Sequence, residues 1–190
     1  MDGLNGMAAG NAVIALIFFG WISFTEGNHF TYTLSYILIA GTLGFFVFNF
    51  PEGRLFMGDV GSTFLGFTFA CIAIISSRYG NCHIPLLVIP LLLFHFIYDT
   101  SFTFCRRFVS GQNVFRAHRT HLYQLFNQLG FSHVMVSCFY FVFAIIQGCG
   151  SLFMVDNPGI SGFLIFIPYL VFQVIYSMVI IYFAKKKNLI

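Results

Sequence analysis

The chain has 190 residues, of which 8% are charged and 58% are hydrophobic, with 28 phenylalanines. A soluble domain carries about 25% charged residues, and a core of this size cannot bury so much apolar surface. The composition excludes a soluble domain, a disordered region and a nucleic-acid-binding protein, and it indicates a protein that lies in a lipid bilayer. The formal net charge is +3, but the positions of Lys and Arg matter more, because they set the orientation of membrane proteins.

Six long apolar stretches are candidates for membrane-spanning helices, since a bilayer core requires about 20 apolar residues in a helix. In chain order they cover residues 3–24, 31–50, 60–77, 84–98 with a continuation to 104, 134–155 and 157–184. The third and fourth are the shortest. The sequence therefore predicts an all-α polytopic membrane protein, with residues 1–190 forming a single integral membrane domain.

Six spans place both termini on the same side of the membrane. If that side is cytoplasmic, eight Lys and Arg residues lie inside and only Arg78 lies outside, as the positive-inside rule requires. The eight are Arg54, Arg106, Arg107, Arg116, Arg119, Lys185, Lys186 and Lys187. The cytoplasmic segments are then the N-terminus, residues 51–59 and the loop 105–133, and we expect the chemistry there.

The first polar motif is Phe-Met-Gly-Asp-Val-Gly-Ser at residues 56–62, where the third expected span begins. The carboxylate of Asp59, beside two glycines and at a helix N-terminus that favours anions, suits a Mg²⁺ ion that bridges to a phosphate. Asp59 can equally be a simple helix cap, a common role for Asp before a helix. Spacing alone leaves both interpretations open.

The second motif is Asp-Gly-Leu-Asn-Gly-Met-Ala-Ala-Gly at residues 2–10. Asp2 and Asn5 are three residues apart and would share one face of a helix, while the small residues allow close helix packing. This arrangement fits the wall of a binding site. It also fits a capped, tightly packed helix start.

The third motif, residues 116–123, spaces Arg116 from Arg119 and His118 from His121 by three residues. On a short helix these donors would form two rows facing a cytoplasmic cavity, where guanidinium and imidazole groups suit a diphosphate. A basic patch that contacts anionic lipid is the alternative. A zinc site is not favoured, because no Cys or carboxylate lies nearby at ligand spacing.

Two ionisable residues, His95 and Asp99, lie four positions apart in the fourth expected span. Ionisable groups at membrane depth are functional hypotheses. Asp99 is near enough to the cytoplasmic end to reach the same cavity, or to pair with Arg106 or Arg107. His95 is expected to form a hydrogen bond between helices.

Together the motifs resemble those of the polyprenyl-phosphate N-acetylhexosamine-1-phosphate transferases of glycosyltransferase family 4. Residues 1–10 resemble the family segment MDG-x-[DN]-G-x-A-[AG], residues 56–62 its FMGD-x-GS signature, and residues 116–130 its late His-containing cytoplasmic loop. The resemblance implies Mg²⁺-dependent transfer of N-acetylhexosamine-1-phosphate from a UDP-sugar to polyprenyl (undecaprenyl) phosphate at the bacterial plasma membrane. Such a transfer releases UMP and initiates synthesis of a cell-envelope polysaccharide or of the O-antigen of lipopolysaccharide.

By motif position, the resemblance implies that Asp59 binds Mg²⁺ and that three more residues are catalytic, namely Asp2, His118 and His121. It also implies a set of substrate-binding residues, which are Asn5, Gly61, Ser62, Arg116 and Arg119. Tyr123 departs from the pattern, because much of the family has a further His there. That departure resembles the subgroup that acts in O-antigen synthesis.

A second departure concerns the parts of the family that come earlier in the chain. Family members have several earlier transmembrane helices and an Asp-Asp pair on a preceding cytoplasmic loop, and Met1 resembles an internal Met of the first motif. We therefore expect the chain to be the C-terminal part of a longer transferase, and to be inactive alone. The alternatives are an inactive remnant of such an enzyme and a small polytopic transporter with His95 and Asp99 at its midplane. Polar residues that gather at one membrane face favour the enzyme, because transporters place them near the midplane.

Overall fold

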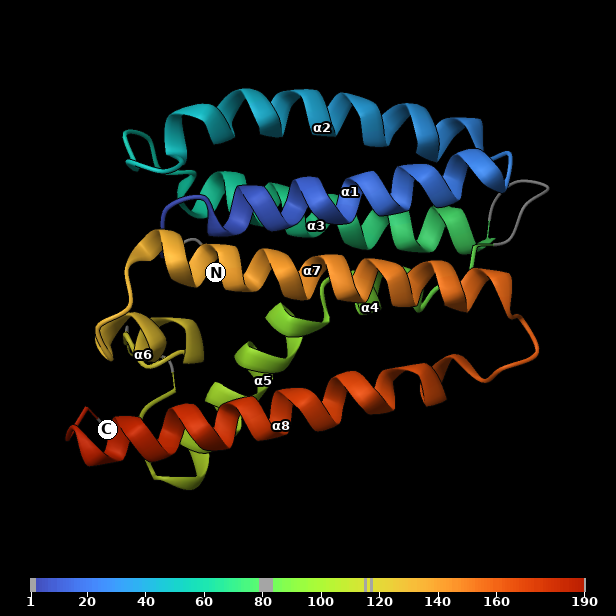
Figure 1. Ribbon diagram of the computed structural model, residues 1–190. Coiled ribbons are helices and arrows are strands. Elements are labelled where there is room, and N and C mark those ends of the chain that lie inside the picture. The colour runs from blue at the N-terminus through green and yellow to red at the C-terminus, as the bar shows by residue number, and fades with distance from the viewer. Residues whose placement is uncertain (1–2, 79–83, 115, 117, 190) are drawn as a thin grey trace.

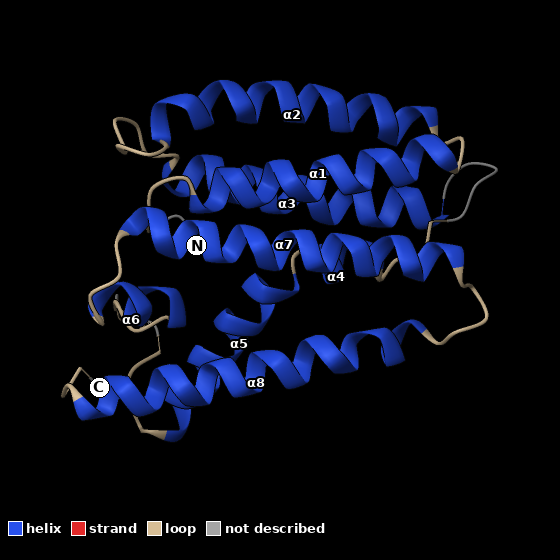
Figure 2. Cartoon of the chain, viewed as in Figure 1, coloured by secondary structure: helices blue, strands red, loops and turns tan. Residues whose placement is uncertain are grey.

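The computed structural model of the chain describes residues 3–78, 84–114, 116 and 118–189, and the regular structure of these residues is entirely helical (Figure 2). An all-α fold is therefore confirmed. The helices in the described part of the chain are α1 (Met7–Thr25), α2 (His29–Asn49), α3 (Gly58–Arg78), α4 (Val88–Leu92), α5 (Phe94–Val109), α6 (Leu122–Gln128), α7 (His133–Asp156) and α8 (Gly162–Lys186).

Five helices, α1, α2, α3, α7 and α8, are long and apolar enough to cross a membrane. They correspond to the first, second, third, fifth and sixth expected spans. The largest difference is at α8, which begins at Gly162 instead of residue 157, because the Pro-Gly pair at residues 158–159 forms a turn after α7.

The fourth expected span is wrong as a single helix. Its residues form the five-residue α4 and the start of α5, which meet at Leu93 with a ψ of 14°. Pro90 lies in the first turn of α4, where its missing amide is tolerated, and this proline prevents the helix from starting a turn earlier. Figure 1 shows that α5 runs at an angle from the middle of the bundle toward the end that carries α6. The two short helices together thus traverse the molecule in place of one span.

The central helix α1 packs against α2 on one side and α7 on the other, and α7 also contacts α4 (Figure 1). Buried apolar side chains form two clusters. One lies mainly between α1, α3 and α4, and the other joins α6, α7 and α8 to Leu4 and Met7 at the N-terminus. The second cluster fixes α6 against the bundle and so positions the loop before it.

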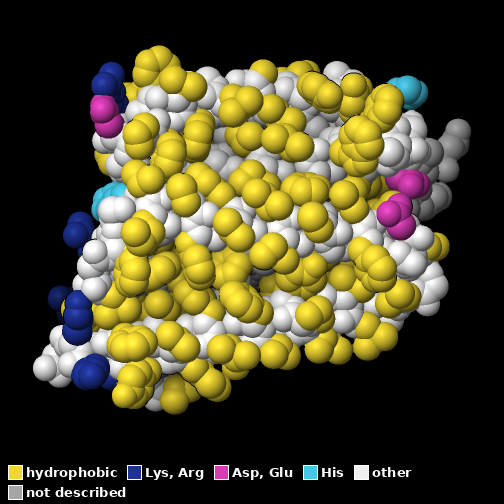
Figure 3. Space-filling model, viewed as in Figure 1, with side chains coloured by type: hydrophobic (Ala, Val, Ile, Leu, Met, Phe, Trp, Pro, Cys, Tyr) yellow, Lys and Arg dark blue, Asp and Glu magenta, His cyan; other side chains and the backbone are white. Residues whose placement is uncertain are grey.

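The outer surface is apolar, as expected of helices that face lipid. Helix α2 fully buries only Thr31, Ser35, Thr42 and Asn49, and many of its large apolar side chains are exposed. The Thr31 hydroxyl donates to Ser23 Oγ of α1 at 2.9 Å. Small and polar residues at helix contacts with apolar residues outside are typical of membrane bundles. Figure 3 shows the resulting broad hydrophobic band on one face of the molecule.

Helix α1 begins and α8 ends at the same end of the molecule, which also carries α6 (Figure 1). Lys and Arg side chains gather at this end in Figure 3, while Arg78 lies at the last turn of α3, at the opposite end. The three polar motifs therefore share one end of the bundle, as the charge pattern predicts.

Candidate active site

A polar cleft of about 400 Å³ lies at the end of the molecule that carries α6. Its walls come from the start of α3, from α5, and from the segment that leads into α6. The lining residues are Gly58, Asp59, Ser62, Thr100, His118, His121, Tyr123 and Gln124. The fold thus brings Asp59 and Ser62 of the first motif to the two histidines of the third.

Asp59 is the second residue of α3, and its side chain is exposed. Within the described part of the chain its carboxylate has no hydrogen bond or ion pair, whereas the Ser62 hydroxyl donates to the carbonyl oxygen of Gly58 at 2.9 Å. The interpretation of Asp59 as a helix cap therefore finds no support in these contacts. An unpaired carboxylate in the first turn of a helix is available to a cation.

Mg²⁺ prefers oxygen ligands, and it is commonly held by one or two carboxylates together with substrate phosphates and water. The described residues contain no group of three His, Cys, Asp or Glu side chains that could hold a metal ion. The Asp59 carboxylate fits a Mg²⁺ site of this kind, in which substrate phosphates complete the coordination of the ion. Among the described residues, no further carboxylate or histidine completes an all-protein metal site with Asp59.

The two histidine rings lie close together in the cleft, with centroids 4.9 Å apart and planes tilted by 33°. The Thr120 amide donates to His118 Nδ1 at 3.4 Å, and His121 stacks on Tyr123 at a centroid distance of 5.8 Å. Burial lowers the pKa of His118 from 6.5, and the nearby Arg107 and His121 lower it further. These surroundings therefore favour the neutral form of His118.

The expected short helix over residues 116–123 is wrong, because α6 begins only at Leu122. The buried guanidinium of Arg107 donates to the carbonyl oxygens of Asn113 and Arg116, at 2.6 and 3.2 Å, and Arg106 donates to the carbonyl oxygen of Thr120. These carbonyls are satisfied by side chains, so the backbone does not need helical hydrogen bonds there. The described part of this loop is therefore irregular, and of its residues before α6 only the two histidines line the cleft.

Arg116 and Arg119 are exposed and do not line the cleft. The Arg119 carbonyl oxygen accepts a hydrogen bond from Gln128 Nε2 at 2.9 Å. Gly61 also lies outside the lining, where a Cβ would meet the flexible side chain of Met57. Diphosphate binding by the two arginines, and substrate binding by Gly61, stay predictions.

The second motif begins with a turn instead of a helix. Gly6 has a φ of 73°, and a Cβ there would meet Phe50, so the helix that was expected to align Asp2 with Asn5 starts only at Met7. Asn5 Nδ2 donates to the carbonyl oxygen of Pro51 at 2.9 Å, and Asn5 does not line the cleft. Asp2 lies outside the described residues.

The second motif nevertheless touches the third. A Cβ on Gly3 would lie 2.6 Å from the hydroxyl oxygen of Tyr123, and Leu4 and Met7 pack in one buried cluster with Leu122 and Tyr123. Tyr123, which stands where an imidazole was expected, is thus a lining residue of the cleft that also fixes the N-terminal turn. All three motifs converge on this end of the bundle.

The sequence did not assign a definite role to Asp99. Pairing of Asp99 with Arg106 or Arg107 is wrong for the described residues, since its carboxylate instead accepts hydrogen bonds from His121 and from the first amides of α6. The hydrogen bond expected of His95 is confirmed: its Nδ1 lies 2.6 Å from Gln147 Oε1 of α7. The signal that could have identified Asp99 was an ionisable residue in an apolar span.

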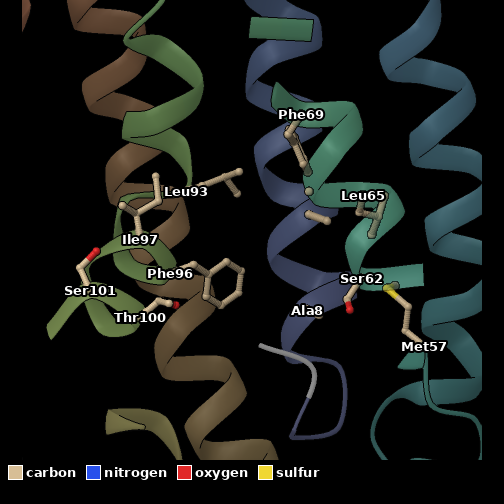
Figure 4. A pocket seen from close by; sticks show the side chains of 12 residues that line it. Ala8, Met57, Ser62, Leu65, Phe69, Leu93, Phe96, Ile97, Thr100 and Ser101 are labelled. Carbon is tan, nitrogen blue, oxygen red and sulfur yellow. The ribbon is translucent and has the colours of Figure 1, made fainter. Parts of the chain in front are cut away.

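An apolar groove of about 420 Å³ adjoins the polar cleft and shares Ser62 and Thr100 with it. Figure 4 shows α3 and α1 on one side of the groove, with Leu65 and Phe69, and α5 on the other, with Phe96 and Ile97. Ser62 and Thr100 place hydroxyl groups where the groove meets the cleft. A long apolar ligand with a polar head fits this combination.

Comparison with known proteins agrees with this geometry. Residues 1–77 match the model of the family described as glycosyl transferase family 4. A probable undecaprenyl-phosphate N-acetylglucosaminyl 1-phosphate transferase of Bacillus subtilis is 30% identical over 177 residues, which cover 92% of this chain and 49% of the relative. A phospho-N-acetylmuramoyl-pentapeptide-transferase of Lactobacillus gasseri is 30% identical over 148 residues, or 76% of this chain and 44% of the relative.

A further phospho-N-acetylmuramoyl-pentapeptide-transferase, from Streptococcus thermophilus, is 45% identical over 73 residues, which cover 38% of this chain and 22% of the relative. The chain spans about half the length of the curated relatives it matches. No solved structure matches it. From the family match, these relatives and the convergence of its three motifs on one cleft, the chain belongs to glycosyl transferase family 4.

Proposed function

We propose that the protein transfers N-acetylhexosamine-1-phosphate from a UDP-sugar to a polyprenyl phosphate such as undecaprenyl phosphate. The observation that carries this proposal is the unpaired Asp59 carboxylate, which lines the same polar cleft as His118 and His121, beside an apolar groove. The names of the bacterial relatives, which specify undecaprenyl phosphate and phospho-N-acetylmuramoyl-pentapeptide, support the lipid and sugar-phosphate classes. The cleft then faces the cytoplasm of a bacterial cell, where nucleotide sugars are found.

The donor diphosphate would lie between Asp59 and the two histidines. A Mg²⁺ ion bound by Asp59 and by the donor phosphates would neutralise charge on the diphosphate. The imidazole rings of His118 and His121 line this part of the cleft, and Thr100 and Ser62 add hydroxyl groups. Phosphoryl transfer depends mainly on positioning and charge neutralisation. Groups of these types can supply both without forming a covalent intermediate.

The acceptor would place its polyprenyl chain in the apolar groove and its phosphate near Ser62 and Thr100. An oxygen of this phosphate attacks the sugar-bearing phosphorus of the donor. A new P–O bond forms as the bond from that phosphorus to the bridging oxygen breaks, and UMP leaves with the bridging oxygen. The product is a polyprenyl diphosphosugar, which starts a cell-envelope polysaccharide.

The polar groups inside the bundle do not favour the transporter alternative. His95 and Gln147 bond to each other, and Tyr98 bonds to Ser177 at 3.0 Å, so these contacts join helices to one another. The clustered, solvent-facing polar groups lie in the end cleft instead.

The test is UMP release by the complete polypeptide, purified in detergent with polyprenyl phosphate, UDP-N-acetylhexosamine and Mg²⁺. We expect Mg²⁺-dependent release that the Asp59→Asn variant loses by a factor of about 10² or more, since the amide keeps the shape but removes the charge. Glu52→Gln is the matched control, because Glu52 is an exposed carboxylate at the same end that pairs with Arg54. Full activity of the Asp59 variant would contradict the assignment, and no release by the wild type would contradict the function. For residues 1–190 alone, binding without turnover stays our prediction.

A further inference from the structure

Asp99 is the most completely buried carboxylate that touches the cleft residues. It lies on α5, and its side chain is 1% exposed. Four donors converge on it in the described part of the chain. Its Oδ1 accepts from Thr103 Oγ1 at 3.0 Å, from the Leu122 amide at 3.0 Å and from His121 Nδ1 at 3.3 Å, while Oδ2 accepts from the Tyr123 amide at 3.3 Å.

These contacts connect two parts of the chain more than 20 residues apart. The Leu122 and Tyr123 amides are the first two of α6, and helix-start amides have no partner within their own helix. By accepting from both amides, Asp99 fixes where α6 begins relative to α5. Since α5 supplies Thr100 to the cleft and the α6 start supplies Tyr123, the same carboxylate sets the distance between two of its walls.

The contact with His121 has a chemical consequence beyond anchoring. Each Asp99 oxygen already accepts a hydrogen bond from a backbone amide, so the contact with His121 is an acceptor contact too and holds the ring with its proton on Nδ1. In the neutral ring, Nε2 is then the unprotonated nitrogen and the one left for the cleft, which His121 lines. An acceptor that holds one imidazole nitrogen commonly sets the tautomer and orientation of the ring in metal and catalytic sites.

The surroundings keep Asp99 in place. One turn earlier on α5, His95 bonds to Gln147 of α7. On the loop side, Arg106 holds the Thr120 carbonyl oxygen, next to His121. The carboxylate therefore lies in a rigid frame on both sides, which a positioning role requires.

We propose that Asp99 is a positioning residue of the transferase, which fixes the Nδ1–H tautomer of His121 and the orientation of its ring in the cleft. This inference rests on the proposed function for its catalytic meaning. Its structural part, the tautomer of His121, stands without it.

The first measurement uses the unaltered complete polypeptide in detergent. Nitrogen-15 NMR of labelled histidines, with His121 assigned by its loss in His121→Gln, reports which ring nitrogen carries the proton at neutral pH. We expect Nδ1–H for His121. An Nε2–H tautomer would overturn the proposal, and because this readout needs no activity, it remains decisive if the proposed function fails.

The second measurement compares Asp99→Asn with Thr103→Val in the UMP-release assay. The asparagine amide loses one acceptor oxygen and the charge, and we expect kcat to fall by about 10² with the KM for UDP-N-acetylhexosamine nearly unchanged. Thr103→Val removes another Asp99 contact of similar burial but leaves His121 alone, so it should keep kcat within about threefold. Equal losses in both variants would show a structural role only and would overturn the proposal.

A double-variant cycle separates positioning from folding. If Asp99 acts through His121, then Asp99→Asn in a His121→Gln background should cause little further loss of kcat, because the two residues act as a unit. If the two substitutions instead reduced kcat by independent, multiplicative factors, Asp99 would not act through His121. Unfolding midpoints followed by the fluorescence of Trp21, the single tryptophan, identify any variant that does not fold, and the NMR result then decides.

Discussion

The two histidines of the cleft, His118 and His121, differ in their hydrogen-bond partners. His121 donates from Nδ1 to the buried Asp99, whereas His118 Nδ1 accepts from the Thr120 amide. His118 also lies near Arg106 and Arg107, and burial together with these cations lowers its pKa below 6.5. One ring is thus bonded to a carboxyl group, and the other has a pKa lowered by burial and by nearby cations.

This difference predicts a pH dependence for donor binding. A bound diphosphate favours the charged form of His118 and so raises the pKa of this histidine above its value in the free protein. Between these two pKa values, donor binding is coupled to the uptake of a proton. The affinity for UDP-N-acetylhexosamine should therefore increase as the pH is lowered from 8 to 6. Isothermal titration calorimetry of the complete polypeptide measures this slope, which His118→Gln should reduce.

The control for that slope is His29→Gln, since His29 lies at the start of α2, at the other end of the molecule. It should leave the pH dependence unchanged. A wild-type slope in His118→Gln would contradict the role of His118. The sign for stability is opposite: with a lowered folded-state pKa, protonation of His118 costs stability as the pH falls below 6.5.

At the scale of elements, the groove exists because α4 and α5 do not form one straight helix. The bend at Leu93 directs α5 away from α3. Apolar side chains of α3 and α5 line the space between these two helices. Gly66 of α3 lies in this lining, and a Cβ there would meet nothing within 4 Å. A larger side chain at this position would enter the groove without a clash.

Gly66→Leu should therefore weaken acceptor binding while the fold is kept. We expect the KM for polyprenyl phosphate to rise about tenfold, the effect of roughly 1–2 kcal/mol of lost fit, with little change in the KM for UDP-N-acetylhexosamine. Gly44→Leu is the matched control, because Gly44 is also helical and its Cβ would meet nothing, but it lies on α2 outside the groove. Equal KM values for polyprenyl phosphate in both variants would contradict the proposal that the polyprenyl chain binds in the groove.

Hydropathy patterns in the sequence predicted most of the helices, but they did not predict the conformation of the loop before α6. Long apolar runs identify α1, α2, α3, α7 and α8, because hydropathy is a property of each segment alone. The irregular structure of residues 116 and 118–121 depends on Arg106 and Arg107, whose side chains bond to carbonyls up to 14 residues away. Similarly, Asp59, His118 and His121 were predicted from motifs, whereas the role of Asp99 requires its contacts with residues 121–123.

At the scale of the whole molecule, charge is separated between the two ends of an apolar body. Lys and Arg side chains gather at the end that carries α6 (Figure 3), and the polar cleft lies at the same end. The opposite end carries Glu26, Arg78 and Asp156, at the ends of α1, α3 and α7. Because Lys and Arg are retained on the cytoplasmic side during insertion, the end with the cleft should face the cytoplasm.

Two serines in exposed loops test this orientation with the same substitution. Ser110 follows α5 at the end with the cleft, and Ser161 precedes α8 at the opposite end. In a background without the native cysteines, Ser161→Cys should react with a membrane-impermeant maleimide in intact cells, and Ser110→Cys should react only after the cells are permeabilised. Both variants should label equally in detergent, which controls for accessibility. Labelling of Ser110→Cys but not Ser161→Cys in intact cells would invert the topology, and would place the cleft on the side of the membrane away from nucleotide sugars.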